Sequence, residues 1–296
     1  MALLAHAVPD NVPGDLFVDD RCIACDTCRQ LAADTFGGGE DETAFVARQP
    51  ADPAARRRAL LALVSCPVAA IGSRSKAGIA AAAAALPVEV APNVFRCGWA
   101  AESSYGASAW LLARPGGNVL VDSPRFARPL LERLRALGGV SLMFLTHRDD
   151  VADHRRWREA LGCERILHAA DVTHGTREVE RRLEGEGPVR LADDLVAIPV
   201  PGHTAGSAAL LAGEEHLFTG DHLWGDADGA LGASRAVCWW DWDEQARSMA
   251  RLAGFPFRRV WPGHGRPWSA PTVEAARDAV RTLAGRMSGD GLSWRA

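Results

Sequence analysis

Four cysteines near the start of the chain constrain its fold more than any other feature of the sequence. Cys22, Cys25 and Cys28 follow one another at every third position, and Cys66 comes much later, directly before Pro67. Three thiolates spaced in this way can wrap one side of a cuboidal iron–sulfur cluster, and a remote fourth thiolate then closes it. The alternative is a structural zinc site made by the same four thiolates. Zinc sites usually pair two C-x2-C knuckles, which is a different pattern.

The C-x2-C-x2-C segment with its later C-P resembles bacterial single-cluster ferredoxins. The resemblance implies one [4Fe-4S] cluster, held by Cys22, Cys25, Cys28 and Cys66. In two-cluster ferredoxins a further cysteine follows after three intervening residues, and this chain has Ala32 there, so a second cluster is not expected. The surrounding sequence predicts strands at residues 15–19 and 43–47, and a helix at residues 53–64 that delivers Cys66.

Composition and charge narrow the possible environments and partners. The chain has seven cysteines, an odd number, and its first residues show neither a basic segment nor a long apolar core. We therefore expect no secretory signal, a reducing cytoplasm and no disulfide framework. The cysteines expected in the core are Cys97, Cys163 and Cys238.

The longest run of mostly alanine, residues 77–86, is too short to span a membrane. A net charge of −4 without a polybasic tract argues against a nucleic-acid partner.

A change of composition near residue 75 predicts a domain boundary. We expect a small α+β domain at residues 1–75, an Ala-rich and partly helical linker at 76–87, and a larger domain at 88–296. In the larger domain, strand-like segments alternate with helical ones, which predicts a layered α/β fold. The expected helices are 129–137, 151–161, 243–252 and 271–286. The expected strands are 94–97, 108–113, 118–122, 142–146, 165–169, 195–200, 208–212, 216–219 and 260–261.

Histidine and aspartate gather in four short strings, each of which follows a strand-like segment. The strings are Thr146–His154, Pro201–Thr204, Thr219–His222 and Pro262–Gly265. Side chains at the carboxyl ends of neighbouring strands converge on one site, and small residues beside them let the backbone approach a metal closely. Imidazole and carboxylate ligands together suit Zn, Fe or Mn. The strings therefore predict a metal site.

In this order the strings resemble those of the metallo-β-lactamase superfamily, over roughly residues 88–290. The resemblance implies a four-layer αβ/βα sandwich with one or two Zn or Fe ions at one edge. By position, His147 matches the first histidine of the family motif, His203 the third ligand of the first metal, and Asp221 the aspartate that bridges both metals. The ligands of the second metal are matched by Asp153, His154 and His264.

The first string departs from the family motif, which is H-x-H-x-D-H. Two extra residues separate His147 from Asp153, and the second histidine is missing. Asp149 stands in its place, with Asp150 next to it. Either of these aspartates substitutes as a carboxylate ligand, or the first metal is weakly held or absent. The alternative for Asp149 is an acid at the start of the helix expected at 151–161.

Other polar residues are expected near this site because of their positions. Asp122 ends a strand-like segment and matches an aspartate that organises the site in the family. His222 either faces the pocket or hydrogen-bonds to a ligand, and His168, on a strand that Asp171 follows, is a weaker candidate. The candidate catalytic residues are Asp153, Asp221 and His222. The histidines expected to be exposed or satisfied by hydrogen bonds are His6, His174 and His216.

Tryptophan is frequent, with ten residues against one tyrosine. Trp157 and Trp224 lie near the metal strings in sequence, and residues 238–242 read Cys-Trp-Trp-Asp-Trp. These side chains either line an apolar substrate pocket or a contact with the ferredoxin-like domain, or they pack in the core.

Two enzymatic functions and one non-enzymatic function follow from these motifs. The first is hydrolysis of a small-molecule ester, thioester, lactone or phosphodiester, as in most members of the superfamily. Two cations that share Asp221 would lower the pKa of a bound water towards about 7 and supply hydroxide as the nucleophile.

The second function is redox catalysis at a non-haem di-iron site fed by the cluster, with a reductase or another ferredoxin as a possible partner. Flavodiiron proteins of the superfamily carry H-x-E-x-D-H, and Asp149 would be the matching carboxylate. The chain shows no flavodoxin-like segment, and the iron-dependent persulfide dioxygenase of the superfamily keeps the usual histidine. The third function is a non-catalytic redox sensor.

Overall fold

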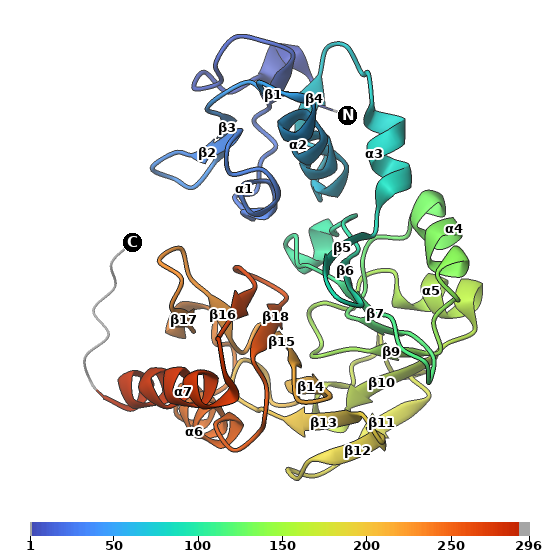
Figure 1. Ribbon diagram of the computed structural model, residues 1–296, viewed down its shortest axis with the longest axis vertical. Helices are drawn as coiled ribbons and strands as arrows, with labels where there is room; N and C mark the ends of the chain where they lie inside the picture. The colour runs from blue at the N-terminus through green and yellow to red at the C-terminus, as the bar shows by residue number, and fades with distance from the viewer. Residues whose placement is uncertain (1, 290–296) are drawn as a thin grey trace. The chain divides into compact units, whose positions relative to one another are not determined.

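The computed structural model describes residues 2–289, which form two compact units (Figure 1). The first unit holds the residues up to Met143 together with Val151–Cys163. The second holds Phe144–Asp150 and the residues from Glu164 onward. No helix among the described residues has both the length and the apolar character needed to cross a lipid bilayer.

The cysteine-rich part of the first unit consists of two short strand pairs and two helices. β1 (Leu16–Val18) pairs antiparallel with β4 (Ile71–Ser73), and β2 (Phe36–Gly38) pairs antiparallel with β3 (Ala44–Val46). A 3-10 helix, η1 (Leu4–His6), precedes them. α1 (Thr27–Leu31) carries Cys28, and α2 (Pro53–Ser65) leads to Cys66.

Helix α2 begins where its sequence provides a cap. The Asp52 carboxylate accepts a hydrogen bond of 2.8 Å from the Ala55 amide, and Pro53 occupies the first helical turn. The buried face of α2 includes Ala59, Leu60 and Ala62, which pack with the strands in the core of this part. The expected strands and helix of this region are therefore present within one or two residues.

The segment expected as a linker contains a helix that belongs to this same core. α3 (Ile79–Ala85) places Ala82 against it, and Leu86 is fully buried there. The domain boundaries at residues 75 and 88 stay a prediction, and residues 290–296 of the expected second domain lie outside the described residues.

The remaining strands of the first unit run antiparallel in sequence order. They are β5 (Val88–Ala91), β6 (Val94–Arg96), β7 (Trp110–Leu112) and β8 (Val119–Val121). The 3-10 helix η2 (Glu102–Ser104) lies between β6 and β7. α4 (Arg128–Ala136) and α5 (His154–Leu161) follow, and the short strand β9 (Leu142–Phe144) precedes the first histidine string.

The second unit is organised around a six-stranded sheet in the order β12-β13-β14-β15-β18-β19. Its strands are β12 (Val189–Ala192), β13 (Leu195–Pro199), β14 (Ala208–Ala212), β15 (His216–Gly220), β18 (Arg259–Pro262) and β19 (Trp268–Ser269). Neighbouring strands are antiparallel except for β15 and β18, which are parallel. Their shared direction brings the ends of these two strands, each followed by a string, to the same edge.

Two helices cover one face of this sheet. α6 (Trp242–Leu252) and α7 (Val273–Ser288) lie side by side in Figure 1. Met249 and Leu252 of α6 pack with Leu217 and Val260 of the sheet, and Val280 of α7 belongs to the same core. The smaller elements are β10 (Glu164–His168), which pairs parallel with β11 (Arg181–Leu183), η3 (Ala169–Asp171), β16 (Trp224–Gly225), β17 (Leu231–Gly232) and η4 (Arg235–Val237).

The fold is thus mixed α/β, as the sequence predicts. The four-layer order stays a prediction. Helix α5 begins at His154 instead of the expected Val151, because residues 151–153 form a turn in which Asp153 takes the position before the helix.

Candidate functional site

The four cysteines of the first unit line one cavity. Cys22 and Cys25 come from the loop that enters α1, Cys28 lies in the first turn of α1, and Cys66 caps the end of α2. The rest of the lining is mostly apolar, and includes Val18, Ile71 and Pro67. A ligand in this cavity would therefore be bound by sulfur and surrounded by apolar side chains.

The spacing of these sulfur atoms fits a cluster better than a single zinc ion. Around one zinc the sulfur atoms would lie about 3.8 Å apart, because each Zn–S bond is about 2.3 Å long. Among the described residues, no three of these Sγ atoms lie within 4.8 Å of one another. The four cysteines line one cavity without such a close group, which suits a cuboidal cluster of iron and sulfide.

The protein also supplies polar contacts to these sulfur atoms. The Ala44 amide donates to Cys22 Sγ at 3.4 Å, and the Ala70 amide donates to Cys66 Sγ at 3.2 Å. Burial raises the pKa of the Cys25 and Cys66 thiols and that of Cys28 still further. Thiolates at these positions therefore need a cationic partner such as cluster iron.

The second unit brings the histidine and aspartate strings together around one carboxylate oxygen. Asp221 Oδ2 lies 3.7 Å from Nε2 of His147, 3.8 Å from Nε2 of His203 and 3.8 Å from Nε2 of His264. These residues come from four different strings, and His147 and His203 are almost fully buried. Atoms at such separations can share a cation placed between them.

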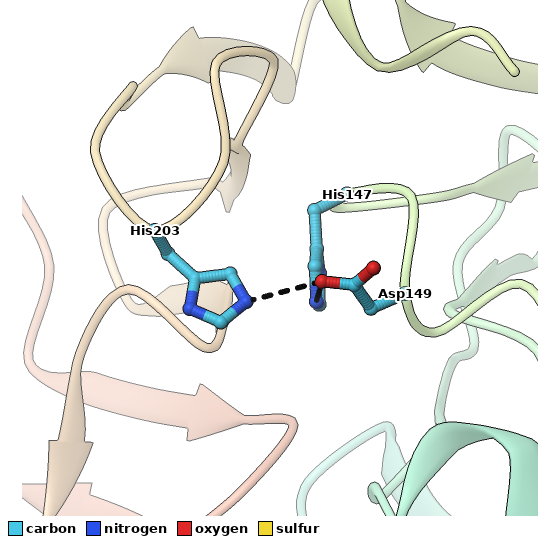
Figure 2. A group of neighbouring side chains, drawn as sticks. All are labelled: His147, Asp149 and His203. Atoms are coloured by element: carbon cyan, nitrogen blue, oxygen red, sulfur yellow. Dashed lines mark ion pairs between the residues drawn. The ribbon is translucent and has the colours of Figure 1, made fainter. Parts of the chain in front are cut away.

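Asp149 joins this group from the first string. One oxygen of its carboxylate lies 3.5 Å from His203 Nε2 and 3.9 Å from His147 Nε2, as the dashed lines in Figure 2 show. His147, Asp149 and His203 can therefore hold one ion together. A second such group is His147, Asp150 and Asp221, so both aspartates considered from the sequence lie at the centre.

Small residues allow this close approach. An ideal Cβ on Gly263 would lie 2.6 Å from Asp221 Oδ1 and 2.8 Å from Asp150 Oδ2. A Cβ on Gly220, whose φ is +51°, would lie 2.3 Å from Thr146 Oγ1. Thr146 in turn holds the His147 ring, because its Oγ1 is 2.9 Å from His147 Nδ1. This contact leaves Nε2 directed to the centre.

Several buried polar atoms at the centre fit a cation as their missing partner. His147 Nε2, His203 Nε2 and Asp221 Oδ1 are buried and have no hydrogen-bond partner among the described residues. Such atoms are costly unless something binds them, and imidazole nitrogen and carboxylate oxygen are common metal ligands. The residues present therefore fit one or two metal ions.

The electrostatics of the centre suit a cation as well. Burial alone would raise the pKa of Asp221, but electrostatic interactions with the His264, His147 and His203 rings outweigh it and keep this pKa below its usual value. The His203 ring, whose Nε2 lies 3.5 Å from the Asp149 carboxylate, likewise lowers the pKa of Asp149. Burial lowers the pKa of His147. Asp149 and Asp221 are therefore ionised at neutral pH, while His147 is a neutral imidazole able to ligate a metal.

A buried aspartate outside the predicted ligand set fastens two of the loops. Asp171 Oδ2 accepts hydrogen bonds from the Arg148 amide at 2.9 Å and from Thr204 Oγ1 at 2.5 Å, and Asp171 Oδ1 accepts one of 2.8 Å from the Gly206 amide. Asp171 is 1% exposed. It thereby joins the loop of His147 to that of His203. The sequence offered only its position after a strand as a signal.

Asp153 and His154 belong to the first unit, and neither is part of the two candidate metal groups. One oxygen of Asp153 accepts a hydrogen bond of 2.7 Å from the Phe126 amide, and His154 is buried at the start of α5. Asp122, also in the first unit, follows β8 with a left-handed φ of +58° and is 2% exposed. Their roles as ligands or organising groups stay predictions.

The other histidines occupy varied settings. His222 is 1% exposed, neither ring nitrogen has a hydrogen-bond partner among the described residues, and burial lowers its pKa to about 3. Nε2 of His168 contacts the Gly185 carbonyl oxygen at 3.0 Å, away from the two metal groups. His216 accepts a hydrogen bond of 3.1 Å from the Trp261 indole, while His6 and His174 are exposed.

The tryptophans and remaining cysteines divide into packing and exposed positions. Trp157 is buried, with its indole donating to the Pro124 carbonyl at 2.7 Å, and Cys97 and Cys163 are buried as expected. Cys238 is only half-buried, and its Sγ lies 3.1 Å from the Gly202 carbonyl oxygen. Trp239 is 61% exposed and stands edge-on to the His203 ring, 6.2 Å between centroids.

Residues 18–73 match the family described as the 4Fe-4S single cluster domain of ferredoxin I. The predicted resemblance of the cysteine-rich segment to single-cluster ferredoxins is thereby confirmed. A comparison with curated proteins gave no match.

The chain is also similar to solved structures. A metallo-β-lactamase from Hirschia baltica is 18% identical and covers 68% of this chain and 96% of its own, with a TM-score of 0.49. ETHE1 from Myxococcus xanthus is 18% identical and covers 63% of this chain and 88% of its own, at 0.42. TTHA1623 in a di-iron-bound form is 25% identical and covers 62% of this chain and 94% of its own, with a TM-score of 0.46. The chain thus combines a segment that matches the single-cluster ferredoxin family with similarity to metallo-β-lactamase superfamily structures.

Proposed function

We propose that this chain is a redox enzyme in which a metal centre converts a small molecule and a [4Fe-4S] cluster carries single electrons. This His/Asp centre is formed by His147, Asp149, Asp150, His203, Asp221 and His264. The observation that supports this function most is the position of Asp149. Its carboxylate lies 3.5 Å from His203 Nε2 and 3.9 Å from His147 Nε2. Two imidazoles and one carboxylate on one ion are typical of non-haem iron sites, and carboxylate ligands favour iron over zinc.

The residues of the centre would each contribute to this chemistry. His147 and His203 would hold one ion with Asp149, and Asp221 would face both this ion and a second one near His264. Bound iron would supply one-electron redox chemistry and a site for the small molecule. A redox partner, either a reductase or another ferredoxin, would load the cluster with electrons.

Hydrolysis is the second candidate function, and the position of Asp221 favours it. Asp221 Oδ2 lies within 3.8 Å of three imidazole nitrogens, which suits a carboxylate shared by two cations. Two zinc ions there would lower the pKa of a water towards about 7, so that hydroxide attacks an ester, thioester, lactone or phosphodiester. The cluster would then have a structural or regulatory role.

Elemental analysis of protein purified without oxygen separates these functions. The redox function predicts about six iron and about four acid-labile sulfides per chain, whereas hydrolysis predicts about four of each with up to about two zinc. The dithionite-reduced protein should then be reoxidised faster by oxygen, nitric oxide or a small persulfide than a chain whose His/Asp centre has been emptied by a chelator. Equal reoxidation of both proteins, together with zinc at the centre, would contradict the redox function.

A further inference from the structure

Arg96, at the end of β6, is a buried cation without a carboxylate partner. The residue is 5% exposed. Its Nη2 donates to Ser108 Oγ at 2.6 Å and to Gln30 Oε1, and its guanidinium carbon lies 5.5 Å from the centre of the Trp110 ring. Among the described residues, no carboxylate oxygen lies within 4.0 Å of the guanidinium nitrogens. All of these direct partners are therefore neutral.

A buried arginine of this kind is unusual. Arginine is almost never fully buried unless it is paired, because an uncompensated charge away from water is costly. Burial lowers the pKa of Arg96 to about 10, while the negative charges of Asp26 and Cys25 act against this change. Asp26 already forms an ion pair with Arg29, so its charge is shared. The remaining negative group near Arg96 is a ligand of the cluster.

The segment that joins β6 to β7 also approaches the cluster cavity at Cys25. Gly106, between β6 and β7, has a φ of +86°, and an ideal Cβ there would lie 2.7 Å from Cys25 Cβ and 2.8 Å from Cys25 Sγ. Thr27 Oγ1, which is 3.4 Å from Cys25 Sγ, donates to the Gly106 carbonyl at 2.9 Å. All of these residues belong to the first unit.

We propose that Arg96 is the fixed counter-charge of the [4Fe-4S] cluster and that it raises the reduction potential of the cluster. With four thiolates, the cluster carries a total charge of about −2 when oxidised and about −3 when reduced. Reduction adds one electron, here from dithionite, with no bond formed or broken and no change in the charge of Arg96. A buried positive charge therefore stabilises the reduced form more than the oxidised form.

This role connects the lactamase-like strands to the redox state of the cluster. Arg96 and Gly106 lie outside residues 18–73, the segment that matches the ferredoxin family. The potential of the cluster would thus be set partly by residues that an isolated ferredoxin lacks. The inference depends on the cluster and not on whether the His/Asp centre is redox-active or hydrolytic.

An anaerobic redox titration of the full chain tests the proposal, with reduction followed by visible absorption and by the electron paramagnetic resonance of the reduced cluster. Arg96→Gln should lower the equilibrium constant for reduction by about tenfold or more, which is a midpoint potential about 59 mV more negative for a one-electron couple. Arg96→Lys keeps the charge, so its equilibrium constant for reduction should stay within about threefold of the wild-type value.

Arg58→Gln is the matched control, because Arg58 is an exposed arginine on α2 that pairs with Asp34. It removes the same charge at a place where water and salt screen it, so the equilibrium constant should change by less than about twofold. An equilibrium constant for reduction of Arg96→Gln that lies within about twofold of the wild-type value would overturn the proposal. If Arg96→Gln does not retain the cluster, retention of the cluster by Arg96→Lys tests the proposal instead. A lysine variant that retains it supports a requirement for charge, and one that also loses it shows that the guanidinium hydrogen bonds matter instead.

Discussion

At the scale of single residues, Asp149 determines which metal the centre prefers in the proposed function. Asp149→His would create the H-x-H spacing found in the metallo-β-lactamase motif. Because imidazole replaces a carboxylate, we expect the variant to bind zinc in preference to iron and to lose at least about tenfold in reoxidation rate. Metal analysis after growth with both metals, and stopped-flow reoxidation of the reduced protein, would measure these two effects.

Asp193→His is the control for this variant, because it makes the same substitution at an exposed turn. Its metal content and reoxidation rate should match those of the wild type. An Asp149→His protein that keeps wild-type iron at the centre would show that Asp149 is not a ligand.

Only some of the residues at the site could be predicted from the sequence. The spacing of the first string identified Asp149 and Asp150 as alternatives, and the structure places both beside His147. The sequence could not choose between them, because that depends on how the loop before α5 folds. The role of Asp171 was harder still to predict, because it hydrogen-bonds to loops that lie more than twenty residues away from it in sequence.

At the scale of elements, the two loops fastened by Asp171 should respond together to its loss. Asp171→Asn replaces one carboxylate oxygen with an amide group that cannot accept from the Arg148 or Gly206 amides. We expect the free energy of unfolding to fall by about 2 kcal/mol, because buried hydrogen bonds to a charged group are lost. The affinity of the centre for metal should fall as well, since His147 and His203 lie on these loops. Urea unfolding and metal titration measure the two effects.

Asp226→Asn is the control, because Asp226 accepts hydrogen bonds from the Asp228 and Ala230 amides in an exposed turn. We expect its unfolding free energy to change by less than about 1 kcal/mol, with unchanged metal affinity. The same loss in both variants would mean that Asp171 has no special role in the site.

Asp15 ties three elements of the cysteine-rich part together. Burial opposes its ionisation, but hydrogen bonds from the Ser75 amide, Arg56 and Ser73 outweigh this and lower its pKa from 3.8 to about 2. A lowered pKa means that the ionised form stabilises the fold above about pH 4, and that this contribution disappears as the pH falls towards 2. Asp15→Asn should therefore cost about 1 kcal/mol at pH 7, after allowance for screening at this partly exposed site.

Urea unfolding at several pH values checks this prediction as a difference between variant and wild type, so that loss of the cluster in acid affects both chains. The difference should be constant from pH 7 to about pH 5 and should shrink below about pH 4. Asp10→Asn, at an exposed position, should show little difference at any pH. A cost that grows in acid would contradict the assignment.

Elements with a periodic apolar pattern were predictable, and elements without one were not. The expected helices correspond to α2, α4, α5, α6 and α7 within about three residues. An amphipathic pattern over several turns is distinctive for the last four, whereas Asp52 and Pro53 mark the start of α2. Strands β16, β17 and β19 have two residues each, which is too short for any alternation. Their pairing depends on the tertiary fold, as does the packing of α3 against the core that contains Cys28 and Cys66.

At the scale of the whole molecule, the two cofactor sites share no residue. The four cysteines of the cluster cavity belong to the first unit, and His147, His203, Asp221 and His264 all belong to the second. Loading of one site should therefore not require loading of the other. We expect a chelator to remove up to about two metal ions per chain while the cluster absorption near about 400 nm is unchanged.

The reverse experiment uses Cys66→Ser, which removes one cluster ligand from the buried end of α2. This variant should lose the absorption of the cluster but retain the metal of the His/Asp centre, as measured by elemental analysis without oxygen. Cys163→Ser is the control, because Cys163 is buried outside the cluster cavity, and it should keep both the cluster and the metal. If chelation bleaches the cluster, or if Cys66→Ser empties the His/Asp centre, the two sites are coupled through the fold. Independent loading would leave electron transfer as the link between the sites in the redox function, whereas the hydrolytic function requires no link at all.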